Sequence, residues 1–260
     1  MTAGFVGLVL LSAYILRVQR ALTATTVYLN FKGHVSVYHQ NGVDNFFAKP
    51  ARYQLTESEL AAIDSALQDQ KDKIQFTGKF ISGAGLLSLG DRSVPVYLTG
   101  VDPEAYRLAH SHPTLLKWAK DWLSDPTSKH DDFLQHPQLI SITESLQQIL
   151  NRKNIDMTLP EKEREVQLAA RTYSNDLNAV NAELGLIHSP GISMKEDTSV
   201  IAPSSLLQGL FDTQGAHYYA VFLNENVSIH SFRNLLQERL KATGLPLEVF
   251  SYDEEAVSPF

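Results

Sequence analysis

The apolar positions divide the chain into an uncharged N-terminal run, two patterned ends and a polar middle. Residues 1–16 carry no charge, and Arg17 and Arg20 follow them. A helix of these 16 residues would reach about 24 Å, less than the about 30 Å of a bilayer's hydrocarbon core. A signal peptide is disfavoured because the basic residues follow the run. We expect residues 1–26 to form a membrane-proximal helix: the remnant of a first transmembrane helix, an amphipathic cap or a buried helix.

Residues 27–108 show the pattern of a β-α-β-β unit. Thr56 and Glu59 have the spacing of a capping box, and apolar residues at helical spacing follow them, which predicts a helix starting there. Asp102 and Pro103 are suited to begin a second, shorter helix. Runs of β-branched and aromatic residues predict strands at 27–31 and 34–38, as one long strand or two linked ones broken near Gly33, and at 74–89 and 94–99.

Residues 199–260 return to a clear β-α-β-α-β rhythm. Two Leu-rich helices, opening at Ser204 and Ser228, separate short apolar strands, and Gly244 ends the second helix. The predicted strands are 200–202, 218–223 and 247–252. We expect the two patterned ends of the chain to pair with each other across the middle segment.

The middle segment, residues 109–198, is expected to form an inserted second lobe. Residues 140–150 have the spacing of a helix. Residues 164–173 and 179–187 alternate apolar and polar side chains on either side of a Ser-Asn-Asp turn, which favours a β-hairpin.

Charge and composition exclude several kinds of site. Lys and Arg number 22 against 29 Asp and Glu, a formal charge of −7, so a surface that binds nucleic acid by neutralising phosphates is not expected. The chain contains no cysteine, which excludes disulfides, thiolate metal sites and a cysteine nucleophile. No G-x-S-x-G, G-x-x-x-x-G-K-[ST] or G-x-G-x-x-G motif is present, so neither serine catalysis nor a cofactor site is predicted.

The histidines of the middle segment are the strongest candidates for chemistry. His110 and His112 flank one residue, and His130, with two aspartates after it, and His136 follow. Imidazole and carboxylate are the ligands that zinc prefers, so a metal-dependent hydrolase using His110, His112 and His130 is one hypothesis. Prolines beside these histidines mark loops, and a solvated polar loop without metal is the reading that we favour.

Two tryptophans in the middle segment are candidates for contact with a partner or substrate. Trp118 and Trp122 stand four positions apart, so they would share one face of a helix. Such a pair is most often part of a helix core, and an exposed pair would suit a hydrophobic ligand or another protein.

Five short segments together resemble a known family. They are Gly-His-Val-Ser-Val-Tyr at 33–38, Gly-Leu-Leu at 85–87, Gly-Val-Asp-Pro-Glu at 100–104, Ala-Pro at 202–203 and Phe-Ser-Tyr-Asp-Glu-Glu at 250–255. In this order they resemble the extracytoplasmic core domain of MacB-type ABC-transporter permeases, a group that includes FtsX-like and LolC/LolE-like proteins. The resemblance covers residues 27–260.

The resemblance implies a two-lobed α+β ectodomain. A discontinuous porter-like β-α-β lobe would be built from residues 27–108 and 199–260, with a Sabre-like lobe of residues 109–198 inserted between them. The apolar start would then be the end of the first membrane helix, and the chain would stop where the second begins.

The resemblance also implies a function without catalysis. The domain would face the periplasm from a bacterial inner membrane and couple ATP hydrolysis by a separate cytoplasmic subunit to export or release of a lipoprotein, lipid or drug. Its partners would be that ATPase, a second permease subunit and a periplasmic or outer-membrane protein. A passive lipid- or peptide-binding module is a further alternative to the hydrolase.

Overall fold

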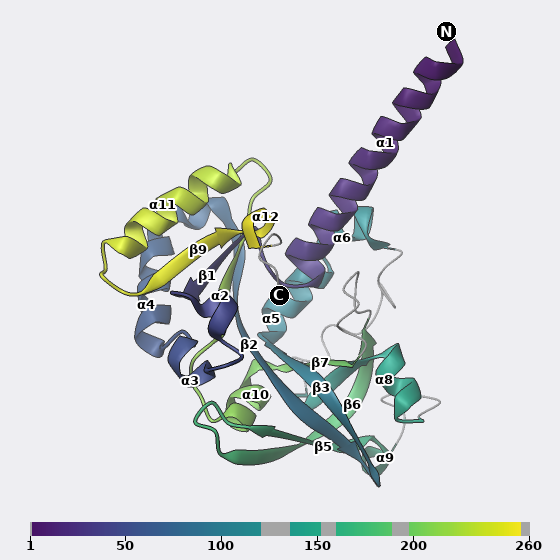
Figure 1. Ribbon diagram of the computed structural model, residues 1–260, viewed down its shortest axis with the longest axis vertical. Helices are drawn as coiled ribbons and strands as arrows, with labels where there is room; N and C mark the ends of the chain where they lie inside the picture. Colours follow the sequence, from purple (N-terminus) through teal and green to yellow (C-terminus); the bar gives the residue numbers. More distant parts are fainter. Residues whose placement is uncertain (1, 121–135, 152–159, 189–197, 256–260) are drawn as a thin grey trace.

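The computed structural model describes residues 2–120, 136–151, 160–188 and 198–255, which form two lobes and a projecting N-terminal helix (Figure 1). The projecting helix is α1 (Thr2–Ala24), and a π-helical turn, η1 (Thr25–Leu29), continues it. A single long strand, β2 (Ile74–Leu89), belongs to both lobes. We call the lobes the sheet lobe and the barrel lobe.

The sheet lobe is an open antiparallel sheet with helices on both faces. Its strands lie in the order β2-β8-β1-β9, so segments from both ends of the chain pair directly. Helices α4 and α11 cover one face, and η1 and α5 cover the other. The elements are β1 (Val35–His39), α2 (Gly42–Asn45), α3 (Pro50–Tyr53), α4 (Glu57–Leu67), η2 (Gln68–Lys73), α5 (Pro103–His110), α6 (Pro113–Trp118), β8 (Tyr218–Leu223), α11 (Ile229–Lys241), β9 (Leu247–Ser251) and α12 (Tyr252–Glu255).

Strand β8 shows why helices cover both faces of this sheet. All six of its residues are buried, so it lacks the polar face of a strand with one solvated side. Alternate residues enter different cores, because successive strand side chains point to opposite faces. Tyr219 and Val221 join the core under α4 and α11, whereas Tyr218 and Phe222 join the core under η1 and α5.

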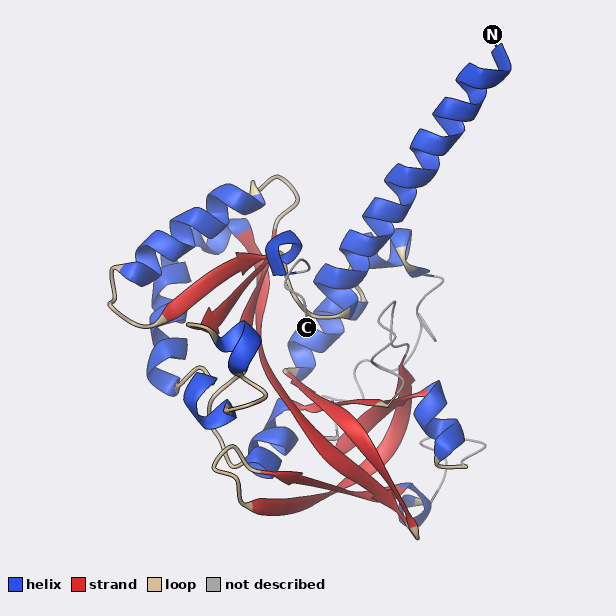
Figure 2. Ribbon diagram, viewed as in Figure 1, coloured by secondary structure: helices blue, strands red, loops and turns tan. Residues whose placement is uncertain are grey.

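The barrel lobe is a closed ring of strands. Among the described residues, the hydrogen-bonded order is β2-β3-β7-β4-β6-β5 and back to β2 (Figure 2). Ring closure leaves no unpaired sheet edge. Apolar side chains of all six strands and of α10 fill the interior. The elements are β3 (Arg92–Val101), β4 (Leu139–Thr143), α8 (Glu144–Ile149), α9 (Glu161–Arg164), β5 (Glu165–Arg171), β6 (Leu177–His188), β7 (Ser199–Pro203) and α10 (Ser204–Phe211).

The strand β2 changes partners where the lobes meet. Residues Ile74 to Phe80 pair with β8 of the sheet lobe. Residues Ile81 to Leu89 pair with β3, and the last part of this segment also pairs with β5. The change falls between adjacent residues, so the two lobes share a continuous backbone at this point.

Most predicted elements are confirmed, including the fold class. The capping box is present: Thr56 Oγ1 accepts from the Glu59 N–H at 3.3 Å, and Glu59 Oε2 accepts from the Thr56 N–H at 2.7 Å. Asp102 caps α5 by accepting from two backbone N–H groups. The hairpin in the middle segment is β5–β6, paired antiparallel.

The prediction of a strand at 27–31 is wrong. These residues continue α1 as the π-helical turn and end in Phe31, whose φ of 56° is left-handed. Val27, Tyr28 and Leu29 are buried against the sheet lobe, so packing of the helix end overrides the strand preference of their side chains.

The prediction of one helix at 140–150 is also wrong. The first half is the fully buried strand β4, and only the second half is the helix α8. A short apolar run is compatible with a buried strand or a buried helix, so spacing alone does not separate them. Thr143 marks the boundary, because its Oγ1 caps α8 by accepting from the Leu146 N–H at 3.3 Å.

Strand pairing assigns several segments to the barrel lobe that lie in the predicted porter-like ranges. The end of β2 and all of β3, within 27–108, belong to the barrel, as do β7 and α10, within 199–260. We therefore propose the sheet lobe and barrel lobe as the division of this chain in place of the three sequence ranges.

Helix α1 is longer than the uncharged run suggested. Residues Gly7–Leu29 form a helix that is long and apolar enough to cross a membrane, and little of its apolar 18-residue window is buried. The part of α1 that precedes the packed base, Thr2 to Arg20, reaches about 28 Å. This length is close to the thickness of a hydrocarbon core, about 30 Å. We therefore revise the expectation that the uncharged run is too short to span a membrane.

Candidate functional site

The base of α1 lies in an aromatic socket on the sheet lobe. Tyr28 stacks on His112 with ring centroids 4.0 Å apart and on Phe222 of β8 at 5.8 Å. Phe31 stacks on Phe80 of β2 at 5.4 Å and lies 5.8 Å from Tyr106 of α5. Aromatic pairs at these separations add to the stability of burial. The helix base is therefore fixed to β2, β8, α5 and the start of α6.

The chain leaves the socket through a tight turn. Gly33 has a φ of 68°, and a Cβ there would lie 2.9 Å from the Val221 carbonyl oxygen, so only glycine fits. The Gly33 N–H donates to the Val27 carbonyl at 3.1 Å, which ties the turn to the helix end. The next residues enter β1, an inner strand of the sheet lobe between β8 and β9.

His34, which follows the turn, bonds to the end of strand β8. Its Nδ1 accepts from the Leu223 N–H at 2.9 Å, so this nitrogen carries no proton. Burial, with a smaller contribution from His112, lowers the pKa of His34 from 6.5 to about 4. The imidazole is neutral at pH 7 and acts as a hydrogen-bond acceptor within the sheet.

A second aromatic cluster fills the junction between the lobes. His217, which precedes β8, stacks on Phe46 at 3.8 Å, and the Phe46 ring also meets Tyr173 of the barrel lobe at 5.4 Å. Phe47 lies 5.7 Å from Tyr97 of β3. The Phe46–Phe47 segment therefore connects the sheet lobe to the end of the barrel.

His217 is a buried imidazole without a polar partner. Within the described residues neither ring nitrogen has a hydrogen-bond partner, while its backbone N–H donates to the Phe80 carbonyl at 2.7 Å. Burial, and then the charge of Lys32, lower its pKa well below 6.5. Nothing in the sequence distinguished this residue, since a histidine before an apolar strand gives no periodic signal.

The structure uses the first two predicted metal ligands for packing. His110 is buried, stacks on Tyr106 at 4.1 Å, and its Nδ1 lies 3.2 Å from the Tyr106 carbonyl oxygen. His112 caps α6, because its Nδ1 accepts from the Thr114 N–H at 3.3 Å. Burial lowers the pKa of His112.

The remaining candidate ligands do not complete a metal site within the described part of the chain. His130 and the aspartates after it lie outside the described residues, and His136 is exposed before β4. The described residues contain no group of three His, Cys, Asp or Glu that could hold a metal ion.

Trp118 lies where α6 meets α1. It is half-buried at the end of α6, and its ring faces Arg20 of α1, whose guanidinium carbon is 4.9 Å from the ring centroid. Trp122 lies outside the described residues, so the predicted pair is represented here by Trp118 alone.

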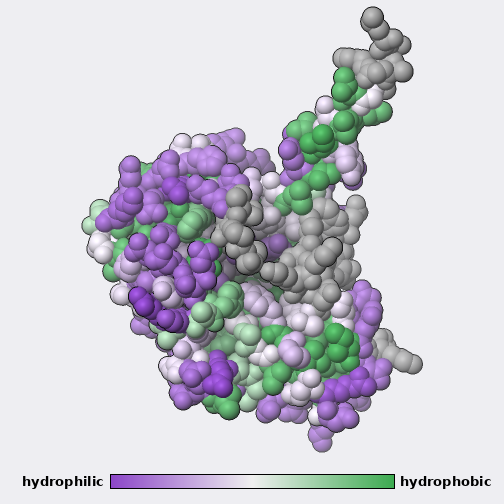
Figure 3. Space-filling model, in the orientation of Figure 1, coloured by the Kyte–Doolittle hydropathy of each residue, from purple (hydrophilic) through white to green (hydrophobic). Residues whose placement is uncertain are grey.

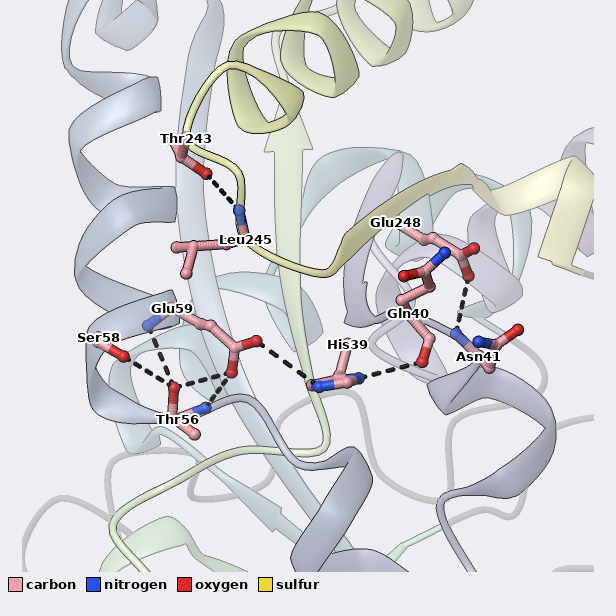
Figure 4. A network of polar contacts seen from close by, with 9 residues as sticks. All are labelled: His39, Gln40, Asn41, Thr56, Ser58, Glu59, Thr243, Leu245 and Glu248. Carbon is pink, nitrogen blue, oxygen red and sulfur yellow. Dashed lines mark hydrogen bonds and ion pairs between the residues drawn. The ribbon is translucent and has the colours of Figure 1, made fainter.

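A His–Glu contact at the sheet edge is structural. His39 Nε2 lies 3.8 Å from Glu59 Oε1, and Figure 4 shows both side chains within a polar network around the start of α4. The other Glu59 oxygen already accepts from the Thr56 N–H and hydroxyl. Because capping occupies the carboxylate, this pair fastens α4 to the end of β1 and is not arranged as an acid–base pair.

A buried Ser–His–Ser chain links three strands of the barrel lobe. Ser141 Oγ lies 3.0 Å from His188 Nδ1, and His188 Nε2 lies 2.9 Å from Ser199 Oγ. All three residues are buried, and burial lowers the pKa of His188 to about 3. The arrangement satisfies polar groups inside the barrel and offers no serine to solvent.

These contacts join the base of α1 to both lobes. The helix base, β2 and the lobe junction form one packed path from a membrane-compatible helix to the far lobe. The candidate site is this path.

Comparison with known proteins identifies the fold. No family model matches the chain, and no curated protein matches it. The periplasmic region of MacB from Actinobacillus actinomycetemcomitans matches with a TM-score of 0.55 and 14% identity, over 84% of this chain and 88% of that one.

Two further solved structures are less similar. The extracellular domain of the ABC-type transporter YknZ from Gram-positive bacteria matches with a TM-score of 0.49 and 15% identity, over 84% of this chain and 99% of that one. A domain of a putative permease protein from Porphyromonas gingivalis matches with a TM-score of 0.44 and 14% identity, over 83% and 85%. The chain has the fold of the MacB periplasmic region, as its sequence segments suggested.

Proposed function

We propose that this chain is the extracytoplasmic domain of an ABC-transporter permease, held in a bacterial inner membrane by α1 and facing the periplasm. One observation carries the proposal: the exposed apolar helix ends in the same packed core as β2, the strand that both lobes share. The likeness to the MacB periplasmic region supports the fold on which the proposal rests.

Movement of α1 would pass to the lobes through the aromatic socket. Packed interfaces transmit displacement because their side chains interdigitate and do not deform continuously. A tilt of α1 would act on β2 and β8 through Tyr28, Phe31 and their stacked partners. The continuous backbone of β2 would then rotate the barrel lobe against the sheet lobe.

The proposed partners follow from this coupling. A separate cytoplasmic ATPase would supply the movement, and a second permease subunit would complete the membrane part. A periplasmic or outer-membrane protein would receive the cargo, which we propose to be a lipoprotein, lipid or drug. The domain itself would carry out no catalysis.

Distances between the lobes test this proposal. The chain lacks cysteine, so introduced thiols are the sole labelling sites. Spin labels at K241C on α11 and L177C on β6, both exposed, would report the separation of the lobes in the reconstituted permease with its ATPase. We expect the distance to change between the nucleotide-free and the vanadate-trapped state.

A matched pair within one lobe is the control. Labels at K241C and E57C both lie on helices of the sheet lobe, and their distance should stay constant. A lobe-to-lobe distance that is the same in both nucleotide states would contradict the coupling and favour a passive binding module.

A further inference from the structure

A short segment of α1 lies between its exposed part and its packed base. Leu8 to Leu16 are exposed, with between 47% and 66% of each large apolar side chain accessible, and burial against the lobe begins at Ala21. Figure 3 shows apolar surface along the projecting helix above the lobes. If α1 spans the bilayer as proposed, residues 17–20 form the lobe-side end of the span, from which the arginine side chains reach the level of the lipid headgroups.

This level is basic, although the chain as a whole is acidic. Arg17 and Arg20 are the first charges of α1 and both are exposed, and their spacing of three places them side by side on the helix. Helix α6 adds Lys117, also exposed, at the same place. We call this place, where α1 meets α6, the basic corner. Its local excess of positive charge contrasts with the net charge of −7 of the whole chain.

Two cations of this corner share one aromatic ring. The Arg20 guanidinium carbon lies 4.9 Å and the Lys117 Nζ 5.1 Å from the centroid of the Trp118 ring. Cation–π attraction accounts for each contact separately. Two like charges held by one ring also repel each other, and a bound anion would relieve that repulsion.

Glu225 is the described carboxylate that acts on this region, through its charge on Tyr28 and His112, and it makes no ion pair with the cations of α1 and α6. Within the described chain, no ion pair involves Arg17 or Arg20 of α1. The same holds for Lys117 and Lys120, near the end of α6. Two acidic groups of α12 are engaged elsewhere, since Asp253 lies near His230 and Glu254 bonds to Arg233. The positive charge therefore faces the level at which headgroup phosphates would lie.

The orientation makes these cations unusual. Basic residues beside a membrane span are typically kept on the cytoplasmic side, whereas this corner lies on the lobe side of α1. A tryptophan with nearby cations is typical of a membrane–water interface, where the ring lies among the headgroups and the cations meet phosphates.

We propose that Arg20, Lys117 and Trp118, supported by Arg17, form a binding site for the headgroup of an anionic phospholipid. The phosphate would lie between the guanidinium and the ammonium group, and the Trp118 ring would contact the glycerol and upper acyl region. Lipid binding would fix the depth of α1 and its angle to the sheet lobe. This inference rests on the proposed membrane anchoring.

Quenching of Trp118 by brominated lipid tests the site. The full chain carrying W122F, so that Trp118 is the one tryptophan, is reconstituted into phosphatidylcholine vesicles. The vesicles contain a small mole fraction of either dibrominated phosphatidylglycerol or dibrominated phosphatidylcholine, equal in the two samples. We expect several-fold stronger quenching by the phosphatidylglycerol, and a smaller difference at high salt.

Charge-removing variants give the matched comparison. R20Q and K117Q should each lower the preference for the anionic lipid about fivefold, and the double variant should abolish it. K71Q removes an exposed lysine on the sheet lobe and should leave the preference unchanged. Because the salt effect is measured on the chain without charge substitutions, the test does not depend on how the variants fold.

Two outcomes would overturn the inference: equal quenching by both lipids at low salt, or no quenching by either. Alkaline extraction of the same vesicles separates this failure from failure of the proposed function. A chain that stays in the membrane but shows no lipid preference contradicts the headgroup site alone. A chain released by alkali contradicts the membrane anchoring on which both proposals rest.

Discussion

Burial lowers the pKa values of three histidine side chains in this protein. His34, His188 and His217 all have pKa values below 6.5, and burial is the first cause for each. His34 and His188 use ring nitrogens in hydrogen bonds, whereas the His217 ring stacks on Phe46 and its nitrogens have no hydrogen-bond partner within the described residues. These imidazoles are neutral at pH 7. Lowering the pH should therefore destabilise the fold, because folding opposes their protonation.

Acid is expected to destabilise the chain through His34. The folded pKa is about 4 and the unfolded pKa about 6.5, so below pH 6.5 the unfolded state binds more protons. Stability present above pH 6.5 is therefore lost as pH falls, by about 3 kcal/mol at pH 4. Urea unfolding in detergent at pH 7.5 and pH 4 measures the loss.

The variant H34N isolates this contribution from those of the other histidines and the carboxylates. An Asn Oδ1 can accept from the Leu223 N–H in place of the imidazole, and it does not titrate. We expect the acid-induced loss to be about 3 kcal/mol smaller in H34N. The same loss in both proteins would show that His34 titrates normally in the folded chain.

Among the elements, β2 is constrained most tightly where it enters the barrel. A Cβ on Gly83 would lie 2.3 Å from Cζ of Phe211, which is buried on α10 and stacked on Tyr173. Gly83 therefore lets α10 approach the strand, and the close packing of α10 on β2 supports the barrel next to the point where the lobes meet.

Replacing this glycine should weaken the barrel lobe. We expect G83A to lower the free energy of unfolding by about 1–3 kcal/mol, because Phe211 or the strand must move. G209A lies on α10 with open space around the new methyl group and should stabilise the helix by up to about 1 kcal/mol. A double-mutant cycle with F211L should show a smaller cost for G83A, and an additive result would contradict the contact.

The sequence predicted those elements whose signals are local. The capping box at Thr56 and the cap at Asp102 depend on residues within one turn, and both are present. The strand expected at 27–31 and the helix expected at 140–150 failed because burial by distant segments decided their conformation. The spacing and propensity of neighbouring residues carry no information about contacts with distant segments.

The candidate site was less predictable than the fold. Tyr28, His112 and Phe222 stack together although they come from three parts of the chain, and His217 meets Phe46 only through the tertiary fold. The closed ring of the barrel likewise depends on a parallel pairing of β3 with β7 and of β4 with β6. Such partners are far apart in sequence and leave no common motif.

In the whole molecule, the two lobes meet through aliphatic and aromatic side chains: Val101, Leu139, Leu186 and Ile201 of the barrel strands share a buried cluster with η1, α5 and β8. Phe47 and Tyr97, with rings 5.7 Å apart, belong to opposite lobes. Rotation of one lobe against the other, which the proposed coupling requires, would rearrange the contacts between these side chains.

Fixing this contact should uncouple the transporter. A short bis-maleimide that joins F47C to Y97C is expected to abolish movement of the K241C–L177C labels and ATP-driven transport, while membrane insertion stays normal. The same reagent on F47C alone is the control and should have no effect. Unchanged transport in the cross-linked protein would show that the lobes need not move against each other.

Labelling from one side of the membrane tests most directly whether the lobes face the periplasm. In spheroplasts of a bacterium that expresses the full chain, a membrane-impermeant maleimide is applied to single-cysteine variants of this cysteine-free protein. We expect K241C to be labelled from outside in intact spheroplasts, and L11C, within the exposed apolar part of α1, to resist labelling. Labelling of K241C only after lysis would place the lobes in the cytoplasm and contradict the account.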